Sequence, residues 1–370
     1  MSSDFTTGMA EATRMTRTGR LADATTLIQR LLRGRGPATT EGPVLPAAAE
    51  TVPRPRQKKR PGLRETIGRL VERARAIESR ELAPPPMVPE GARFGAATFA
   101  NATGRRDYKL YVPASAANRG PRPLVLMLHG CTQNPDDFAR STGMNQAAEE
   151  VGALVLYPGQ PAVANPKRCW NWFRPEDQRG EGGEAGLLAE LTMSVVAAEN
   201  VDPARIYVAG ISAGGAMAAN LAAERPDIFA AAGVHSGLPA GAAHDAPSAF
   251  GAMRSGAQGR RAERPVRTII FHGDADRTVN PVNAAAVSAQ AAAGAPLVVR
   301  TDRGSVGGRA YSRTTHTDGW GRTRVEQWMI HGAGHAWSGG DASGSHADAA
   351  GPDASREMLR FFLDGHPDPD

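Results

Sequence analysis

The sequence feature that most constrains the fold is a short apolar run that ends directly in a Gly-x-Ser-x-Gly pentapeptide. Ile206–Ala209 has the composition of a buried strand, Gly210–Gly214 reads Gly-Ile-Ser-Ala-Gly, and an alanine-rich helical stretch follows. A sharp turn between a strand and a helix strains the backbone at the serine, and the two glycines leave room for both elements to approach. Ser212 is therefore predicted at the N-terminus of a helix, where partial positive charge favours an anion. The alternative is a small-residue turn that only packs a helix against a sheet.

From about residue 92 the chain alternates short apolar runs with helical stretches. Continuous apolar runs are typical of strands buried on both faces of a parallel sheet, whereas Tyr108–Val112 alternates as an exposed strand does. The predicted strands are Tyr108–Val112, Leu124–Leu128, Leu154–Tyr157, Ile206–Ala209, Ala231–Val234, Thr268–Phe271 and Val325–Ile330, and the predicted helices include 184–199 and Ser355–Leu363. This alternation predicts the α/β class with a doubly wound, mostly parallel sheet, whose working residues follow the carboxyl ends of the strands.

Residues 1–90 are predicted to form an N-terminal extension that is separate from the α/β domain at 91–370. The extension holds 16 Lys and Arg residues against 10 Asp and Glu, and the α/β domain holds 27 against 28, so the net charge of +5 comes from the extension. Two amphipathic helical segments, Leu21–Leu32 and Leu63–Ile77, flank a Pro/Arg-rich linker at about 34–61 that cannot bury enough surface to order itself. We expect these helices to dock on the α/β domain or on another copy. Adsorption to a granule or another apolar or anionic surface is the alternative.

The composition also argues against several classes of protein. The near-neutral charge of the α/β domain disfavours nucleic-acid binding, which requires a basic face with interleaved aromatics. The sequence contains no long apolar run, so we expect no transmembrane helix. It shows no signal peptide, which favours the cytoplasm, although the compartment stays open. The two cysteines are too few for a zinc site, and the nine histidines form no H-x-x-x-H pair with an acidic residue between them, so no metal or other cofactor is expected.

A serine hydroxyl becomes a nucleophile only when a base takes its proton and an acid orients that base. In the α/β-hydrolase fold these residues follow one another along the chain as Ser, Asp or Glu, and His. The strand Thr268–Phe271 runs into His-Gly-Asp-Ala-Asp, which offers two aspartates. Asp276 lies further into the loop and is the preferred acid, whereas Asp274 is also placed to cap the following turn.

Two histidines compete in the same way for the role of base. The strand Val325–Ile330 runs into His-Gly-Ala-Gly-His, with His331 at the strand edge and His335 on a small-residue loop. A general base must come within hydrogen-bond reach of the hydroxyl, and the flexible loop favours His335. A histidine at a strand edge, such as His331, is commonly satisfied by backbone groups.

The oxyanion that forms during acyl transfer needs two amide donors. The amide of Ala213, which follows the nucleophile, supplies one, and the loop after the strand Leu124–Leu128 supplies the other. That loop reads His-Gly-Cys-Thr-Gln, and we expect the amide of Cys131 to be the donor. Cys131 is disfavoured as a thiol nucleophile because no base and orienting acid are placed to serve it.

Cys169 follows the next strand and loop, so its sulfur can meet that of Cys131. We predict a disulfide that ties the oxyanion loop to the segment Trp170–Phe173, with two reduced thiols, as in a cytosolic protein, as the alternative. Trp170, Trp172 and Trp337 flank the presumed active-site loops. They either line an apolar substrate cleft or pack beneath the loops.

These motifs together resemble the poly(3-hydroxybutyrate) depolymerase-like esterases, an α/β-hydrolase family with feruloyl and acetylxylan esterase relatives. The matching segments are Leu128–Gln133, Leu156–Pro158, Cys169–Phe173, Gly210–Gly215, His272–Asp276 and Gly334–Trp337, and the resemblance covers roughly residues 95–365. Many members of the family are extracellular, whereas this sequence shows no signal peptide and no Ser/Thr-rich linker.

The resemblance implies a serine carboxylester hydrolase with Ser212 as nucleophile, His335 as base and Asp276 as acid. Its expected substrates are poly(3-hydroxybutyrate) or hydroxyalkanoate oligomers, cleaved through an acyl-enzyme, and feruloyl or acetylxylan esters are the alternative. The resemblance also implies the cysteine pairing predicted above. A non-catalytic role, binding to a granule or a partner through residues 1–90, is a further alternative.

Overall fold

The structure is a computed structural model. It describes residues 15, 86, 88–115, 120–294 and 296–364. The two amphipathic helices and the linker predicted within residues 1–90 lie outside the described residues, so they and the domain boundary near residue 90 remain predictions.

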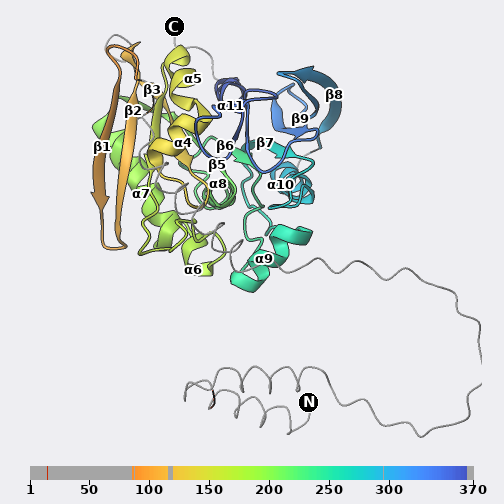
Figure 1. Cartoon of the computed structure of the whole chain (residues 1–370), viewed down its shortest axis with the longest axis horizontal. Coiled ribbons are helices and arrows are strands. Elements are labelled where there is room, and N and C mark those ends of the chain that lie inside the picture. Colours follow the sequence, from red (N-terminus) through yellow and green to blue (C-terminus); the bar gives the residue numbers. More distant parts are fainter. Residues whose placement is uncertain (1–14, 16–85, 87, 116–119, 295, 365–370) are drawn as a thin grey trace, which may run out of the picture. The chain divides into compact units, whose positions relative to one another are not determined.

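Ten strands of the described chain form one sheet in the spatial order β1-β2-β4-β3-β5-β6-β7-β10-β9-β8 (Figure 1). These strands are β1 (Arg93–Ala100), β2 (Arg105–Val112), β3 (Arg122–Leu128), β4 (Leu154–Pro158), β5 (Val201–Ile211), β6 (Ala231–His235), β7 (Arg267–Gly273), β8 (Val298–Val306), β9 (Arg309–Thr317) and β10 (Thr323–Ile330). Two further short strands, β11 (Trp337–Ser338) and β12 (Ala347–Asp348), form a separate parallel pair.

The central strands β4, β3, β5, β6, β7 and β10 run parallel to one another. The strands β1 and β2 are antiparallel on one side of this core, and β9 and β8 are antiparallel on the other. The predicted mostly parallel sheet is therefore confirmed, and β3 and β4 are buried along their whole length. β2 differs from the exposed strand predicted from its alternation, because β1 pairs along its outer edge and Tyr111 and Val112 are buried.

Helices cover both faces of the sheet, as in a doubly wound fold. The described helices are α4 (Pro135–Thr142), α5 (Met144–Val151), α6 (Pro175–Gln178), α7 (Gly183–Ala198), α8 (Ala213–Glu224), α9 (Ala246–Ser255), α10 (Val282–Ala292) and α11 (Ala354–Leu363). Successive strand residues point to opposite faces. In β5, Val208 joins the core beneath α7 and α8, while Tyr207 joins the core beneath α5 and α11. None of the helices in the described part of the chain is long and apolar enough to cross a bilayer.

Local sequence chemistry fixes the helix ends near the loops of interest. Asn134 caps α4 by accepting a hydrogen bond from the backbone N–H of Asp137 at 2.9 Å, and proline occupies the first turn. Asp245 and Ser248 form a reciprocal capping box at the start of α9. These caps hold both helices at defined starting points beside the strand ends.

The carboxyl ends of β5, β6, β7 and β10 lie side by side, because the four strands are parallel neighbours. The loops that follow them carry Ser212, Asp274, Asp276, His331 and His335. In Figure 1 this edge faces downward, with α6 and α9 beside it. The topology thus gathers residues that are distant in the sequence at one edge of the sheet.

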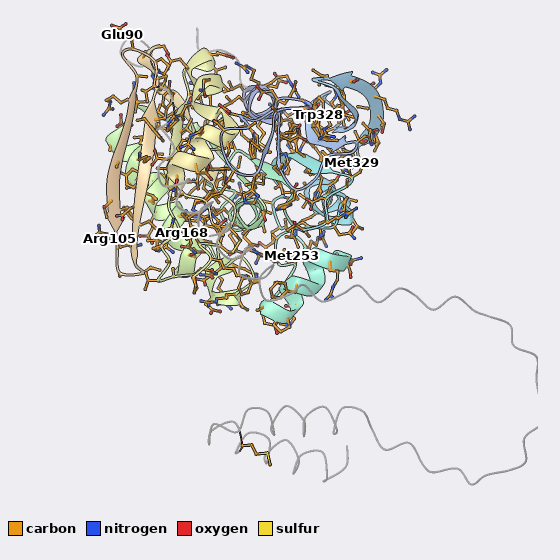
Figure 2. All side chains as sticks on the ribbon, viewed as in Figure 1. Glu90, Arg105, Arg168, Met253, Trp328 and Met329 are labelled. Carbon is orange, nitrogen blue, oxygen red and sulfur yellow. A yellow bond between two sulfur atoms is a disulfide. The ribbon has the colours of Figure 1, made fainter. Side chains whose placement is uncertain are left out.

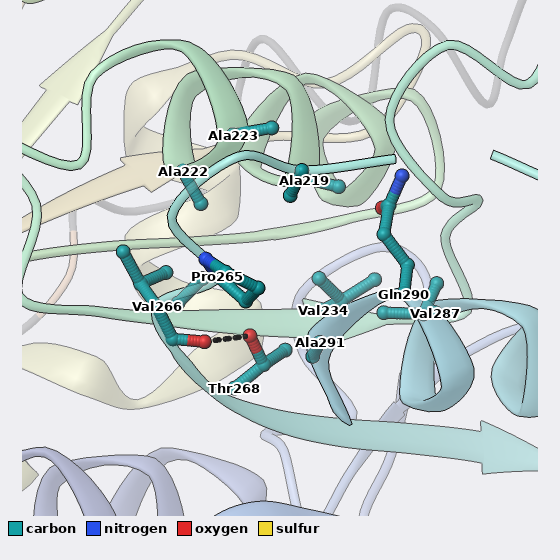
Figure 3. Close-up of a pocket in the computed structure, with 12 residues that line it drawn as sticks. Ala219, Ala222, Ala223, Val234, Pro265, Val266, Thr268, Val287, Gln290 and Ala291 are labelled. Atoms are coloured by element: carbon teal, nitrogen blue, oxygen red, sulfur yellow. Dashed lines mark hydrogen bonds between the residues drawn. The ribbon is translucent and has the colours of Figure 1, made fainter. Parts of the chain in front are cut away.

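A small hollow lies between α8, α10 and the strands β6 and β7 (Figure 3). Its walls are mostly alanine, valine and proline side chains, and Thr268 in the wall donates its hydroxyl to the carbonyl of Val266 at 3.1 Å. Its volume of about 30 Å³ is close to that of one water molecule. We regard it as a packing void, because it is far too small for a substrate.

Candidate active site

The strand, turn and helix predicted around Ser212 are present, with Ser212 as the single residue between β5 and α8. Its backbone has φ 57° and ψ −121°, and its N–H donates to the carbonyl of His235 at 3.0 Å. A positive φ is uncommon for residues other than glycine and marks a strained turn. A Cβ atom at Gly214 would lie 2.0 Å from the carbonyl oxygen of Leu128, so this close approach requires glycine.

Asp276 and His335 form a buried hydrogen-bonded pair. The Nδ1 atom of His335 lies 2.7 Å from Oδ2 of Asp276, and the two side chains are 14% and 0% exposed. The other carboxylate oxygen accepts the backbone N–H groups of Thr278 at 2.8 Å and Val279 at 2.9 Å. Burial opposes the charged form, but the hydrogen bonds from His272 and His335 outweigh it and hold the pKa of Asp276 well below its usual range. An ionised carboxylate only accepts, so it fixes a proton on Nδ1 of His335 and leaves Nε2 free to act as a base.

His272, which sequence reasoning set aside, lies against the same carboxylate. It is the penultimate residue of β7, and its side chain is fully buried, with Nε2 2.9 Å from the carbonyl of Val279 and 3.5 Å from Oδ2 of Asp276. A carbonyl oxygen can only accept, so Nε2 of His272 carries the proton, and it lies near Oδ2 of Asp276 whereas the loop amides donate to Oδ1. Its position in the strand end, two residues before Asp274, was the only sequence indication of this role.

The competing pair, Asp274 and His331, is also hydrogen-bonded. Nδ1 of His331 lies 2.8 Å from Oδ2 of Asp274, Nε2 lies 2.9 Å from the hydroxyl of Ser312, and the N–H of Gly332 donates to Oδ1 of Asp274 at 2.7 Å. The side chains of the pair are 42% and 41% exposed, in contrast to those of Asp276 and His335. Each aspartate therefore has its own histidine, and the two pairs differ in burial and in their surroundings.

His235, at the end of β6, is hydrogen-bonded to the serine turn and to Ser338. Its carbonyl accepts from Ser212, its Nε2 accepts the N–H of Ser338 at 3.0 Å, and its side chain is 1% exposed. Burial, reinforced by the nearby His272 and His335, holds the pKa of His235 well below its ordinary value. His235 is therefore a neutral imidazole that adds no charge beside the serine turn.

The predicted disulfide between Cys131 and Cys169 is present. It joins the loop after β3 to the segment after β4, and the N–H of Thr132 donates to the carbonyl of Lys167 at 2.7 Å beside it. The amide N–H groups of Cys131 and Ala213, the two predicted oxyanion donors, have no acceptor within the described residues. Both are therefore available to a developing negative charge.

A buried glutamate, which sequence reasoning did not single out, anchors this region. Glu184, 3% exposed at the start of α7, accepts from Arg106 at 2.8 Å, from the backbone of Asn171 at 2.6 Å and from the side chain of Gln160 at 2.5 Å. The backbone N–H of Gln160 in turn donates to Nε2 of His129 at 3.1 Å. The only sequence indication was a carboxylate at the start of a largely apolar helix. Glu184 therefore fixes the segment that carries Cys169, and Gln160 links that segment to the loop that carries Cys131.

The structure favours the packing alternative for the tryptophans. Trp170, Trp172 and Trp337 are 0%, 4% and 0% exposed. The indole N–H of Trp170 donates to the carbonyl of His129 at 3.0 Å, and that of Trp337 donates to the hydroxyl of Ser355 at 3.1 Å. Their rings support the active-site loops from beneath and do not line an open cleft.

A family model described as Esterase PHB depolymerase matches residues 106–301, which is more than half of the chain. This chain belongs to the Esterase PHB depolymerase family. The matched range includes the serine turn, both cysteines and both candidate aspartates, whereas the two candidate histidines follow it.

Curated relatives of this family member carry several esterase names. Poly(3-hydroxyalkanoate) depolymerase C of Paucimonas lemoignei is 35% identical over 176 residues, covering 44% of this chain and 42% of the relative. The chain spans about half the length of the curated depolymerases it matches, 42% of this one and 51% of another. Feruloyl esterase B of Neurospora crassa is 28% identical over 283 residues, covering 71% of this chain and 89% of the relative. Among solved structures, an acetyl xylan esterase from Aspergillus awamori has a TM-score of 0.54 at 21% identity, covering 73% of this chain and 98% of that one. The predicted α/β-hydrolase fold is therefore confirmed.

Two grooves lie at the carboxyl edge of the sheet in this Esterase PHB depolymerase family member. One, of about 340 Å³, adjoins the oxyanion loop and is lined by residues that include Gln133, Gln160 and Arg168. The other, of about 500 Å³, adjoins the loop of Asp276 and is lined by residues of α9 that include Met253. Arg168 and Met253, which are labelled in Figure 2, mark the two grooves. Both volumes fall in the range of roughly 300–1,000 Å³ that is usual for small-molecule sites.

Proposed function

We propose that this chain is a serine carboxylic ester hydrolase that acts through Ser212, His335 and Asp276. The observation that carries the proposal is the buried hydrogen bond of 2.7 Å between His335 and Asp276, at the same sheet edge as the strained turn of Ser212. Family membership and the esterase names of the relatives point to the same reaction class.

In the proposed reaction the hydroxyl of Ser212 attacks the ester carbonyl carbon while Nε2 of His335 takes its proton. Asp276 stays ionised and stabilises the resulting imidazolium, since its hydrogen bonds hold its pKa well below the usual range. The amides of Cys131 and Ala213 bind the oxyanion, and the proton of His335 passes to the departing alcohol. A water molecule activated by the same imidazole then attacks the acyl-enzyme and releases the acid.

We assign hydroxyalkanoate esters, either polymer or short oligomers, as the substrate class, because the relative matched at 35% identity is named as a poly(3-hydroxyalkanoate) depolymerase. Feruloyl or acetylxylan esters are the second candidate, because a relative that covers 71% of this chain is named as a feruloyl esterase. Relative rates on a hydroxybutyrate trimer, methyl ferulate and acetylated xylan distinguish the two. A trimer rate below both of the others would reject our assignment.

The catalytic proposal is tested by hydrolysis of p-nitrophenyl butyrate. The change Ser212→Ala should lower kcat by roughly 10⁴-fold or more, because it removes the nucleophile. Ser312→Ala, which removes the hydroxyl next to the exposed His331, is the matched control and should retain wild-type activity. Retention of activity by Ser212→Ala would refute the proposed mechanism.

We further propose that residues 1–90 associate with a granule surface or another protein chain, since the basic charge of the sequence is concentrated there. Sedimentation with purified granules compares the full chain with one that starts near residue 91. Equal partitioning of the two would exclude a granule anchor.

A further inference from the structure

The groove beside Asp276 combines an apolar wall with two guanidinium groups. Its lining consists of Phe250, Met253, Arg254, Asp276, Arg277, Thr278 and Asn280. Phe250 is 64% exposed, which is unusual for a phenylalanine and leaves its ring available to a ligand. The volume of about 500 Å³ is sufficient for a small ester substrate.

Hydrogen bonds fix the position of this groove relative to the proposed triad. The backbone N–H of Asn280 donates to the carbonyl of Met253 at 2.7 Å, and its side-chain amide donates to the carbonyl of Arg254 at 3.0 Å. These bonds join the end of α9, which follows β6, to the loop that follows β7. The groove therefore lies at the carboxyl edge of the strands, next to the loop that holds Asp276.

Several arginines elsewhere in the described chain are paired with carboxylates, whereas the two arginines of the groove are not. Arg260 is paired with Glu224, Arg225 lies 2.7 Å from Asp227, and Arg174 lies 3.9 Å from Asp177. Arg254 and Arg277 are exposed and form no ion pair with any residue that the structure describes. The carboxylate of Asp276 does not serve them, because its side chain is fully buried and is hydrogen-bonded to His335 and to loop amides.

We propose that Arg254 and Arg277 bind the terminal carboxylate of a hydroxyacid ester while Phe250 and Met253 pack against its alkyl chain. The inference rests on the proposed function and specifies its substrate class as carboxylate-terminated oligomers. A guanidinium group donates two parallel hydrogen bonds to a carboxylate, which makes arginine the preferred partner for this group. Hydrolysis of one ester bond consumes one water and releases a hydroxyacid, which leaves the next ester bond to be cleaved. The enzyme thus shortens soluble oligomers from the carboxylate end.

The experiment compares two substrates that differ only in charge, the free-acid dimer of 3-hydroxybutyrate and its primary carboxamide. Cleavage of the internal ester bond is followed by chromatography for the wild-type chain and the double variant Arg254→Gln/Arg277→Gln. We expect the wild-type KM to be lower for the acid and to rise with salt, since exposed charges are screened. In the double variant the preference in kcat/KM for the acid over the carboxamide should fall about tenfold or more, with most of the change in KM.

Arg300→Gln on β8 is the matched control, because Arg300 is an exposed arginine on the edge strand and does not line the groove. It should keep the wild-type preference. An equal kcat/KM for acid and carboxamide in the wild type, or an unchanged preference in the double variant, would overturn the inference. A wild-type chain that cleaves p-nitrophenyl butyrate but neither dimer would also overturn it while leaving the proposed function intact. Equal activity of Ser212→Ala on p-nitrophenyl butyrate would instead reject the proposed function.

Discussion

Two aspartate–histidine pairs lie a few residues apart at the same edge of the sheet, and their contrast shows what the proposed site requires. The distances are nearly equal, 2.7 Å between His335 and Asp276 and 2.8 Å between His331 and Asp274. The first pair is buried and the second is about two-fifths exposed. Pair geometry alone therefore does not distinguish a base and its orienting acid from an aspartate–histidine pair at the surface.

The exposed pair also has a serine as a hydrogen-bond partner, because Nε2 of His331 lies 2.9 Å from the hydroxyl of Ser312. This gives Ser312, His331 and Asp274 the connectivity of a catalytic triad. Ser312, however, lies within the antiparallel strand β9, whereas Ser212 stands in a strained turn at the N-terminus of α8. A helix N-terminus and free loop amides stabilise an oxyanion, and the strand offers neither. The turn, more than the hydrogen-bonded chain, distinguishes the two serines.

The exposed pair has a different task, which is to hold two loops together. Asp274 binds both His331 and the N–H of Gly332, and the N–H of Ala275 donates to the carbonyl of Ala333 at 3.0 Å. These bonds tie the loop that carries Asp276 to the loop that carries His335. Asp274 and His331 are thus positioning residues for the buried pair.

The largest expected difference concerns the two histidines. His335→Ala should lower kcat on p-nitrophenyl butyrate by roughly 10⁴-fold or more, because it removes the proposed general base. His331→Ala should lower it by less than about tenfold, because only loop positioning is affected. Steady-state kinetics of both variants check this, with circular dichroism to verify the fold. Equal losses of kcat in the two variants would show that the difference in burial does not determine the roles of the two pairs.

The second difference concerns the two aspartates. Asp276→Asn should lower kcat by up to roughly 10⁴-fold, because an amide can hold the imidazole in the wrong tautomer. Asp274→Asn leaves that tautomer intact and should cost only a few-fold. The measurement is kcat at saturating substrate, and a larger loss in Asp274→Asn than in Asp276→Asn would exchange the roles of the two pairs.

The sequence predicted the parts of the site that depend on local pattern. The apolar runs of the central strands, the turn at Ser212 and the disulfide of Cys131 with Cys169 all follow from adjacent residues or from strand order. The polar edge strands were missed, since Val298–Val306 has no apolar run or strict alternation. Edge strands are stabilised mainly by pairing with a neighbour, which a single sequence does not display.

Spacing alone could not decide between Asp274 and Asp276, because both follow β7 in one short loop. The choice depends on which carboxylate is covered by His272 and by the loop amides, and that is a tertiary property. For the same reason the sequence did not indicate the role of Glu184, whose partners Arg106 and Asn171 come from distant segments. The burial of the three tryptophans could not be predicted from the sequence either, since a ring beneath a loop and a ring in a cleft have the same sequence neighbours.

A third difference concerns the dependence of stability on pH. The pKa of Asp276 is held well below its usual range in the folded chain, so its contribution is fully present above the unfolded value near pH 4 and is lost as the pH falls below it. The contribution is expected to be on the order of 2 kcal/mol. Urea unfolding at pH 5, 4 and 3 should show a free-energy advantage of wild type over Asp276→Asn that shrinks with falling pH. An advantage that is constant over this range would contradict the assigned ionisation.

The smallest expected effect concerns the stability that the exposed pair contributes. The pKa of Asp274 is also lowered, since the hydrogen bonds from His331 and Gly332 outweigh its partial burial. The pair is accessible to solvent, so Asp274→Asn should change the free energy of unfolding by only about 0.5–1 kcal/mol. High salt screens exposed charges, so the effect measured at neutral pH should decrease between 0.05 M and 1 M NaCl, whereas that of Asp276→Asn should change little. If the two variants respond equally to salt, both carboxylates are equally shielded from water, and the contrast between a buried pair proposed to be catalytic and an exposed pair proposed to position it no longer holds.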